Sequence, residues 1–302
     1  MGYSGRYHAA SLAAVFLALA IGILIGVGLG HNVLSGAQKD LEKSLKTDLA
    51  NTRGRNQDLQ TELSREHEFS SQVYPALVED LLRGNRIAVV ALGGLPDGIK
   101  GDIESVVGPN SATGAQLGEV AIVREPPDLH ALAGAAKGTR WRAAPRDSGT
   151  LTALARRFGR ALVIGGPPFG RFQDSLLTGI SGRPGRIDAV IVVRNQPTGL
   201  GAGQSAATDG LEAGILAGLE RAGRVPVVGV ERSDADPSSI GMFTSSGLSA
   251  TVDSTDLTSG RVALAYALDG AQGNFGIKST ADRLLPALGR PSVASPPISG
   301  TR

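Results

Sequence analysis

An apolar run near the N-terminus, residues 9–30, constrains this chain more than any other feature, because it contains no charged side chain. At about 1.5 Å rise per residue, a helix of this run spans roughly 33 Å, and the hydrocarbon core of a bilayer is about 30 Å thick. The run is longer than the roughly 7–15 apolar residues of a secretory signal, so we expect an uncleaved transmembrane helix. Cleavage near the small residues Ser35, Gly36 and Ala37 is the alternative.

The flanks of this run do not decide its orientation. Arg6 precedes it, while Lys39, Lys43 and Lys46 follow it among acidic residues, so a count of positive charges gives no clear side. A short head, residues 1–8, before a long hydrophilic remainder fits an N-terminus inside the cell. We therefore expect a single-pass protein of the inner (plasma) membrane whose bulk is extracytoplasmic.

Small residues recur every fourth position along the apolar run and form one ridge of the predicted helix. The ridge consists of Ala10, Ala14, Ala18, Gly22, Gly26 and Gly30. Small residues at this spacing let two helix backbones approach closely in lipid, where packing drives association. The ridge predicts that the helix pairs with itself or with another membrane protein, whereas a composition rich in Gly and Ala throughout is the simpler explanation.

Residues 31–83 are charged and polar, and they carry a heptad pattern that predicts a coiled-coil stalk. Seam positions spaced alternately four and three apart are Leu45, Leu49, Thr52, Asn56, Leu59, Leu63, Glu66, Ser70, Val73 and Leu77. Asn56 at a seam position would fix the register at some cost in stability. We expect a homodimeric coiled coil, and a single amphipathic helix lying on the C-terminal domain is the alternative.

Residues 85–290 alternate between two kinds of pattern and predict an α/β domain. Apolar, β-branched runs that predict strands are residues 86–92, 119–123, 161–164, 187–193, 225–230 and 248–252. Patterns with helical spacing are residues 97–107, 151–159, 209–222 and 257–268. Continuous apolar strands alternating with helices favour a doubly wound, mostly parallel, Rossmann-like sheet. Residues 291–302 are expected to form a disordered tail.

The inventory of reactive residues argues against catalysis. The chain has no cysteine and four histidines, of which only His130 belongs to the α/β domain. A formal net charge of +2, with no basic patch interleaved with aromatic residues, gives no argument for nucleic acid as a partner. We therefore expect no enzyme activity, no catalytic or metal site, and no cofactor. Asp234, Asp236, Asp253 and Asp256 are assigned to loop capping.

Two segments resemble the actinobacterial MctB family. The first is Arg6-Tyr7-His8 followed by the stretch from Ser11 to Gly22, and the second is the stretch from Asn274 to Ala281 with Leu284-Leu285-Pro286 after it. The order of anchor, coiled coil and α/β domain is also similar over nearly the whole chain.

The resemblance implies two different functions. Members of the family are described as mycobacterial copper transport proteins, which implies copper efflux through the outer membrane. Related corynebacterial proteins of the SteB type imply an inner-membrane protein that pairs with a SteA protein. That pair promotes cell separation by acting on a peptidoglycan hydrolase through coiled-coil contacts.

The residues themselves favour the second function. Cu(I) prefers thiolate or thioether ligands, and this chain has no Cys and only Met1 and Met242 as methionines. We therefore expect a dimeric, membrane-anchored docking module that serves a SteA-like membrane protein and a cell-wall hydrolase. Copper transport, with ligands such as His31 and Met242 brought together across protomers, is the alternative, and it goes with an outer-membrane location.

Overall fold

The computed structural model describes residues 5–182, 185–223 and 225–289, without the side chains of residues 5, 6 and 29–40. The chain divides into two compact units, Met1–Glu66 and His67–Arg302. The expected tail, residues 291–302, and half of the expected head, residues 1–4, lie outside the described residues.

The first unit is helical and belongs to α1, Gly5–Val78, whose last turns lie in the second unit. Residues Tyr7–Gly28 are long and apolar enough to cross a membrane, and none of this span is buried. The charged part beyond is supported by local contacts of the i, i+4 kind, such as Lys46 Nζ to Glu42 Oε1 at 2.7 Å. Helicity across residues 31–78 agrees with the expected stalk, while pairing into a coiled coil stays a prediction.

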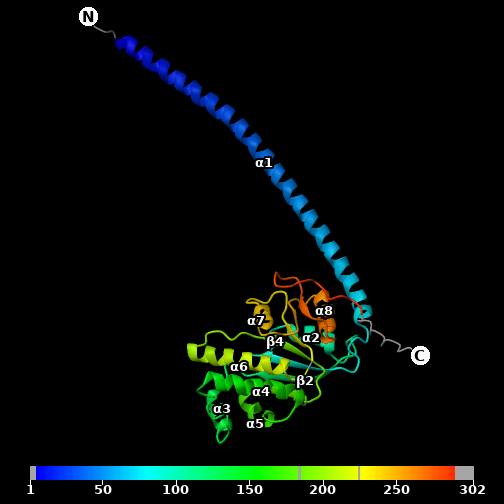
Figure 1. Ribbon diagram of the computed structural model, residues 1–302. Helices are drawn as coiled ribbons and strands as arrows, with labels where there is room; N and C mark the ends of the chain where they lie inside the picture. The colour runs from blue at the N-terminus through cyan, green and yellow to red at the C-terminus, as the bar shows by residue number, and fades with distance from the viewer. Residues whose placement is uncertain (1–4, 183–184, 224, 290–302) are drawn as a thin grey trace, which may run out of the picture. The chain divides into compact units, whose positions relative to one another are not determined.

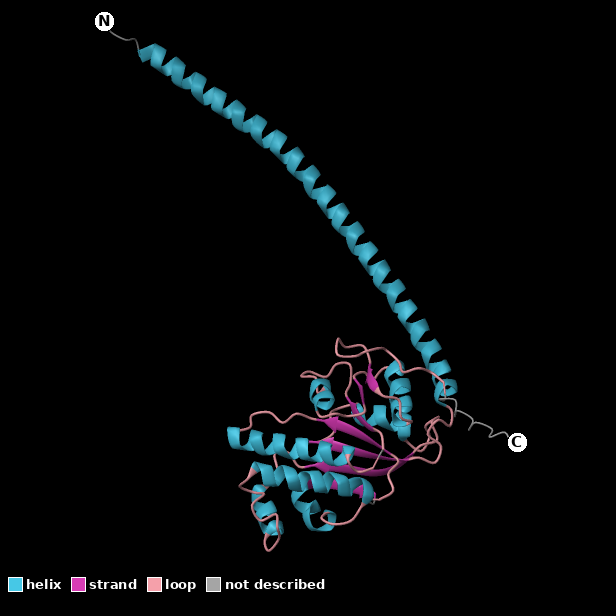
Figure 2. Cartoon of the chain, in the orientation of Figure 1, coloured by secondary structure: helices cyan, strands magenta, loops and turns pink. Residues whose placement is uncertain are grey.

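The second unit is an α/β domain built on one seven-stranded sheet, shown in Figure 2. The strands are β1 Arg86–Leu92, β2 Gln116–Val123, β3 Leu177–Gly182, β4 Ala189–Arg194, β5 Val227–Val230, β6 Ala250–Val252 and β7 Gly273–Phe275. Their order is β3-β2-β1-β4-β5-β6-β7, and every pair is parallel except β2 with β3.

Helices cover both faces of this sheet, as Figure 1 shows. They are α2 Ile99–Val107, α3 Leu129–Ala136, α4 Ser148–Ile164, α5 Phe169–Leu176, α6 Ala202–Glu220, α7 Ile240–Ser245 and α8 Thr258–Leu268. One core cluster joins the sheet to α3–α7, and the other joins it to α2, α8 and the end of α1. The expected mixed α/β architecture with a mostly parallel sheet is confirmed, and its closer likeness to a Rossmann fold stays a prediction.

The second core cluster takes in the last turn of α1 and the residues just after it. Val78 and Leu82 are fully buried, and Tyr74 and Leu77 pack partly buried against them. The hydroxyl of Tyr266 donates a hydrogen bond to the Leu77 carbonyl oxygen at 3.2 Å. The final turns of the long helix are therefore a layer of the α/β domain.

One predicted strand is wrong. Residues 161–164 form the last turn of α4, which Asp147 begins by accepting a hydrogen bond from the Thr150 amide at 2.7 Å. The apolar spacing of the helix runs through Phe158 and Leu162 to its end, and a four-residue apolar run cannot be told from a helix end by pattern alone. The sequence does not predict strands β3 and β7, because both are edge strands and neither is a continuous run of β-branched residues.

Helices α4 and α6 touch through glycine. A Cβ atom on Gly218 would overlap the Arg156 carbonyl oxygen, and one on Gly214 would lie 2.5 Å from the Thr152 carbonyl oxygen. The two backbones therefore meet without side chains between them, which fixes α4 against α6.

Replacing Gly218 by Ala should lower the free energy of unfolding by about 1–3 kcal/mol, because the added methyl group forces the helices apart. The measurement is urea unfolding of the full chain in detergent. Gly203→Ala is the matched control, since Gly203 also lies in α6 but has nothing within 4 Å of its Cβ position. That control should raise stability by about 0.4–1 kcal/mol, and equal effects of the two changes would contradict close helix contact.

Candidate functional site

The expected ridge residues lie on the first unit and are open to the surroundings. Ala10, Ala14, Ala18, Gly22 and Gly26 are exposed. Gly30 lies in α1, outside the residues whose exposure is described. The structure places these residues in one helix, and pairing through them stays a prediction.

The expected seam residues fall into two groups. Leu45, Leu49, Leu59 and Leu63 are between 49% and 69% exposed, and Asn56 is exposed with them. At the end of the seam, by contrast, Val73 is half-buried and Leu77 packs against the second core cluster. The leucines of the first unit are thus an apolar row that the described residues leave uncovered, whereas Leu77 packs against the α/β core.

A group of buried ionisable side chains lies at the carboxyl ends of β1, β2 and β4. Here the strand order reverses, because β2 lies on one side of β1 and β4 on the other. Arg194 donates two hydrogen bonds to the Glu212 carboxylate, Nε to Oε1 at 2.6 Å and an Nη atom to Oε2 at 3.1 Å. The neighbouring Glu125 carboxyl is enclosed and has no hydrogen-bond partner among the described residues. Burial and then the Glu212 carboxylate raise the pKa of Glu125 to about 9. Such ends of parallel strands are where ligands bind in open α/β sheets.

Glu119 is a second buried acid of this sheet. It lies on β2, is 2% exposed, and its carboxyl oxygens have no hydrogen-bond partner among the described residues. Burial raises the pKa of Glu119 to about 7, against the smaller opposing effect of Arg86. Both Glu119 and Glu125 are therefore acids that the fold keeps protonated well above the ordinary range of a carboxyl group.

The carboxyl ends of β5 and β6 hold a separate polar network. Glu231 accepts hydrogen bonds from the Lys278 ammonium at 2.6 Å, the Ser238 hydroxyl at 2.7 Å and the Ser239 amide at 2.6 Å. Asp253 accepts from the backbone amides of Ile277 and Lys278 at 2.8 and 3.0 Å. These contacts hold the segment after β7 against the sheet.

The segment after β7 requires glycine at position 276. Its φ of +142° lies in a region that other residues rarely adopt, and a Cβ there would overlap the Asp253 carboxylate. The loop-capping role expected for Asp253 and Asp256 agrees with their contacts, because Asp256 accepts from both the amide and the hydroxyl of Ser233. Among the described residues, no group of three or more His, Cys, Asp or Glu side chains could hold a metal ion.

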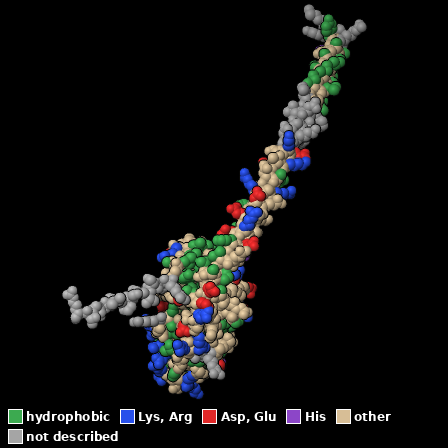
Figure 3. Space-filling view, turned by 90° about the vertical axis from the view of Figure 1, so that its right-hand side faces the viewer, with side chains coloured by type: hydrophobic (Ala, Val, Ile, Leu, Met, Phe, Trp, Pro, Cys, Tyr) green, Lys and Arg blue, Asp and Glu red, His purple; other side chains and the backbone are tan. Residues whose placement is uncertain are grey.

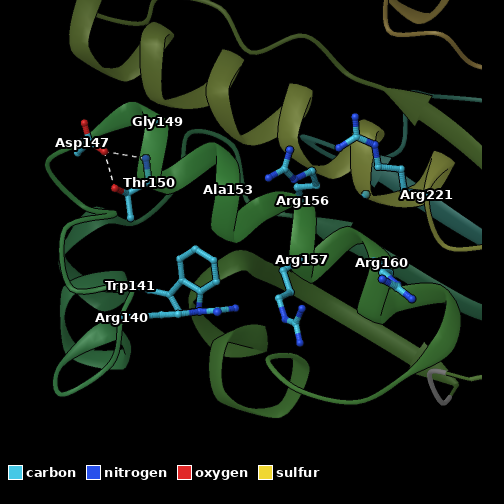
Figure 4. Close-up of a pocket in the computed structure, with 11 residues that line it drawn as sticks. Arg140, Trp141, Asp147, Gly149, Thr150, Ala153, Arg156, Arg157, Arg160 and Arg221 are labelled. Carbon is cyan, nitrogen blue, oxygen red and sulfur yellow. Dashed lines mark hydrogen bonds between the residues drawn. The ribbon is translucent and has the colours of Figure 1, made fainter.

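The structure gathers basic side chains into a patch that the net charge of the chain does not predict. Five arginines line a cavity of about 680 Å³ beside Trp141, and we call this the arginine groove (Figure 4). They are Arg140, Arg156, Arg157, Arg160 and Arg221. Figure 3 shows Lys and Arg side chains gathered on the lower part of the α/β unit, at the height that α4 and α5 occupy in Figure 1.

A local count of charge would have found this groove. Residues 137–171 contain eight basic residues and one acid, Asp147, while the whole chain has a formal net charge of only +2. The total hides the patch because acids elsewhere in the sequence balance it.

Comparison with known families settles the chain's relationships. The family described as "Copper transport outer membrane protein, MctB" matches residues 3–125 and 172–286. The chain belongs to this family. The resemblance expected from the segments after Arg6 and after Asn274 is thereby confirmed.

The curated relatives match over a shorter stretch. Proteins named "Copper transporter MctB" from Mycobacterium tuberculosis and Mycobacterium bovis are 31% identical over 120 residues, 40% of this chain and 38% of the relative. The Mycobacterium leprae protein of the same name is 31% identical over 101 residues, 33% of this chain and 31% of the relative. The chain thus matches less than half the length of these relatives, and no solved structure matches it.

The MctB match leaves out residues 126–171. This gap holds α3, α4 and four of the five groove arginines, whereas the seam, the buried acids and the Lys278 network lie within the matched residues. The groove is therefore a feature of this chain that the family match does not describe.

Replacing Glu125 by Gln should flatten the dependence of stability on pH. An unfolded glutamate ionises near 4.5 and the folded Glu125 near 9, so the folded state binds more protons between these values. The stabilisation is full below pH 4.5 and is lost as the pH rises to 9, by up to about 1.4 kcal/mol for each pH unit.

Urea unfolding of the full chain at pH 5, 7 and 9 measures this slope. The uncharged amide does not titrate, so Glu125→Gln should lose less stability than the unchanged chain as the pH rises, with Glu119 leaving a residual slope below about pH 7. Glu62→Gln, an exposed change in α1, should keep the original slope. Parallel slopes for the Glu125 variant and the unchanged chain would show that Glu125 ionises as an ordinary carboxyl.

Proposed function

We propose that this MctB-family protein is a single-pass, membrane-anchored envelope protein that acts as a non-catalytic docking module. It sits in the inner membrane with its bulk outside the cytoplasm, and it is dimeric through α1. Its partners are a SteA-like membrane protein and a peptidoglycan hydrolase, as the resemblance implies, and its role is in cell-wall hydrolysis and cell separation.

The observation that carries this proposal is the apolar row on α1. Leu45, Leu49, Leu59 and Leu63 stand about half or more exposed in a part of α1 whose other side chains are mostly polar or charged. Leucines at heptad positions are stabilised when a second helix inserts its own side chains between them. A second copy of this chain, or the coiled coil of a partner, supplies such a helix.

The apolar span supports the same arrangement. Residues Tyr7–Gly28 are suited to a bilayer, and their ridge of small residues offers a second contact between two copies of α1. A SteA-like membrane protein would bind this ridge in place of the second copy of α1 or beside it. Pairing in the membrane and pairing in the stalk then act on one continuous helix.

The polar groups of the α/β unit support a docking role over catalysis. Arg194 is held by Glu212, and Lys278 is held by Glu231, so these charges serve packing. Glu125 is close to the Arg194–Glu212 pair. It does not line the small cavity of about 100 Å³ beside Arg194 and Glu231. These buried contacts hold the fold rigid, as a docking module requires.

Copper transport is the second candidate, and the names of the family and of its curated relatives favour it. It goes with an outer-membrane location by the family's description. Of the two ligands considered for it, Met242 is half-buried on α7 and packs against the first core cluster, and the His31 side chain lies outside the described residues. A copper site would have to form between copies of the chain.

Polar substitution of the seam should separate the two helices. We expect the triple change of Leu45, Leu59 and Leu63 to Gln to convert a dimer of the full chain in detergent into a monomer, because it removes three leucines that the dimer would bury. Sedimentation equilibrium measures the mass. A double change of Thr47 and Thr61 to Gln alters exposed positions on the face opposite the seam and should leave the dimer intact. A triple variant that stays dimeric would contradict the coiled coil.

Copper analysis separates the two candidate functions. The docking role predicts that the full chain, purified in detergent and mixed with Cu(I) and a competing chelator, retains less than about one tenth of an equivalent of copper. Elemental analysis after gel filtration measures the ratio, with an unrelated single-span protein as the control. One equivalent of copper for each chain or dimer would place copper transport first.

A further inference from the structure

The arginine groove is built from three segments that meet on one face of the α/β unit. Arg156, Arg157 and Arg160 come from α4, Arg221 directly follows α6, and Arg140 comes from the segment between α3 and α4 (Figure 4). The cavity between them is about 680 Å³, within the usual range of ligand pockets.

The positive charge of this groove is not balanced by the protein. Among the ion pairs of the described residues, none includes any of the five groove arginines. The one acid that lines the cavity, Asp147, accepts hydrogen bonds from the amide and the hydroxyl of Thr150 and so begins α4. Like charges gathered in one concave surface repel each other and attract anions.

Three arginines elsewhere in the same unit, by contrast, are paired with buried acids. Arg194 lies 2.6 Å from Glu212, Arg232 lies 2.6 Å from Asp102, and Arg261 lies 3.6 Å from the same aspartate. What sets the groove apart from these three sites is that it gathers several arginines around one cavity without a carboxylate partner among the described residues. Five exposed guanidinium groups around one cavity fit a ligand that brings several negative charges.

The groove is also held in shape by its supports. Gly218 lets α6 lie directly on the Arg156 backbone, which brings Arg221 alongside α4. Arg140 lies over the Trp141 ring at 4.5 Å from its centre, and Trp141 packs against the first core cluster. An arginine held by an aromatic ring loses less freedom when it binds, and its planar fork suits phosphate oxygens.

We propose that the arginine groove binds a soluble chain that carries several phosphate groups, such as a phosphodiester-linked polymer. Charges distributed along a concave groove match a flexible chain better than a flat bilayer surface. Each phosphodiester repeat supplies a full negative charge with oxygens that accept two N–H groups of one guanidinium. This binding goes beyond the docking role and depends neither on dimerisation nor on copper.

The test uses the chain's own fluorescence, because Trp141 is its single tryptophan and lines the groove. The full chain in non-ionic detergent is titrated with short-chain inorganic polyphosphate. We expect a saturable change in tryptophan emission, with an affinity that falls as salt rises, because bound cations are released from the polyanion.

A double variant, Arg156→Gln with Arg160→Gln, should weaken this binding about tenfold or more. The slope of log affinity against log salt should become shallower by about 1–2, because two cationic contacts are lost. Arg53→Gln with Arg55→Gln is the matched control, since it removes two exposed arginines from α1 and should bind as the unchanged chain does. Equal urea midpoints for all three proteins verify that folding is intact.

Four outcomes would overturn the proposal. They are no saturable change with polyphosphate, equal weakening in the two double variants, tighter binding of poly-glutamate of equal charge, and binding of phosphatidylglycerol vesicles without binding of polyphosphate. The third would assign the groove to carboxylates, and the fourth would assign it to a membrane surface.

Discussion

The α/β unit depends on a sheet whose central strands are apolar on both faces. Strands β1 and β4 are buried almost throughout, so each face must be covered to keep valine and isoleucine side chains from water. On one face α4 and α6 provide the cover, pressed together through glycine, and this contact also sets the arginines of α4 beside Arg221. On the other face the cover comes from α2, α8 and the end of α1. The groove and the attachment of the long helix are both products of covering one sheet.

The sequence predicts the centre of this fold better than its edges. Strands β1, β4, β5 and β6 follow from continuous β-branched runs, because burial on both faces leaves little freedom in residue type. Residues 161–164 have the same composition but complete α4, since the cap at Asp147 and the spacing before them decide for a helix. Strands β3 and β7 contain no such run. Each is an edge strand, which pairs with a neighbour on one side, and this pairing cannot be read from the residues of the strand alone. Glu125 and Glu212 are too far apart in the chain for any motif to join them.

Charge gives a second lesson on what can be predicted from sequence. The net charge of a chain does not show where its charged side chains lie in the fold. In this unit several acids are buried, while many arginines are exposed. Acids such as Glu212, Glu231 and Asp253 lie inside, each holding a donor, while most of the arginines between residues 137 and 171 lie outside. The family match covers the first set and skips the second. The matched part of the chain therefore holds the buried acids, while the unmatched part supplies α4 and four of the five groove arginines.

The burial of Val78 and Leu82 has a consequence for cutting the chain between its two units. The compact unit begins at His67, before the turn that ends α1, because the last turns of the helix complete one face of the core. A protease that cut in the turn at residues 79–84 would strip this layer away and expose the apolar side chains beneath it. A cut on the N-terminal side of Tyr74 would leave this layer in place. The position of a single cut in or just after α1 therefore decides whether the α/β unit keeps its complete core.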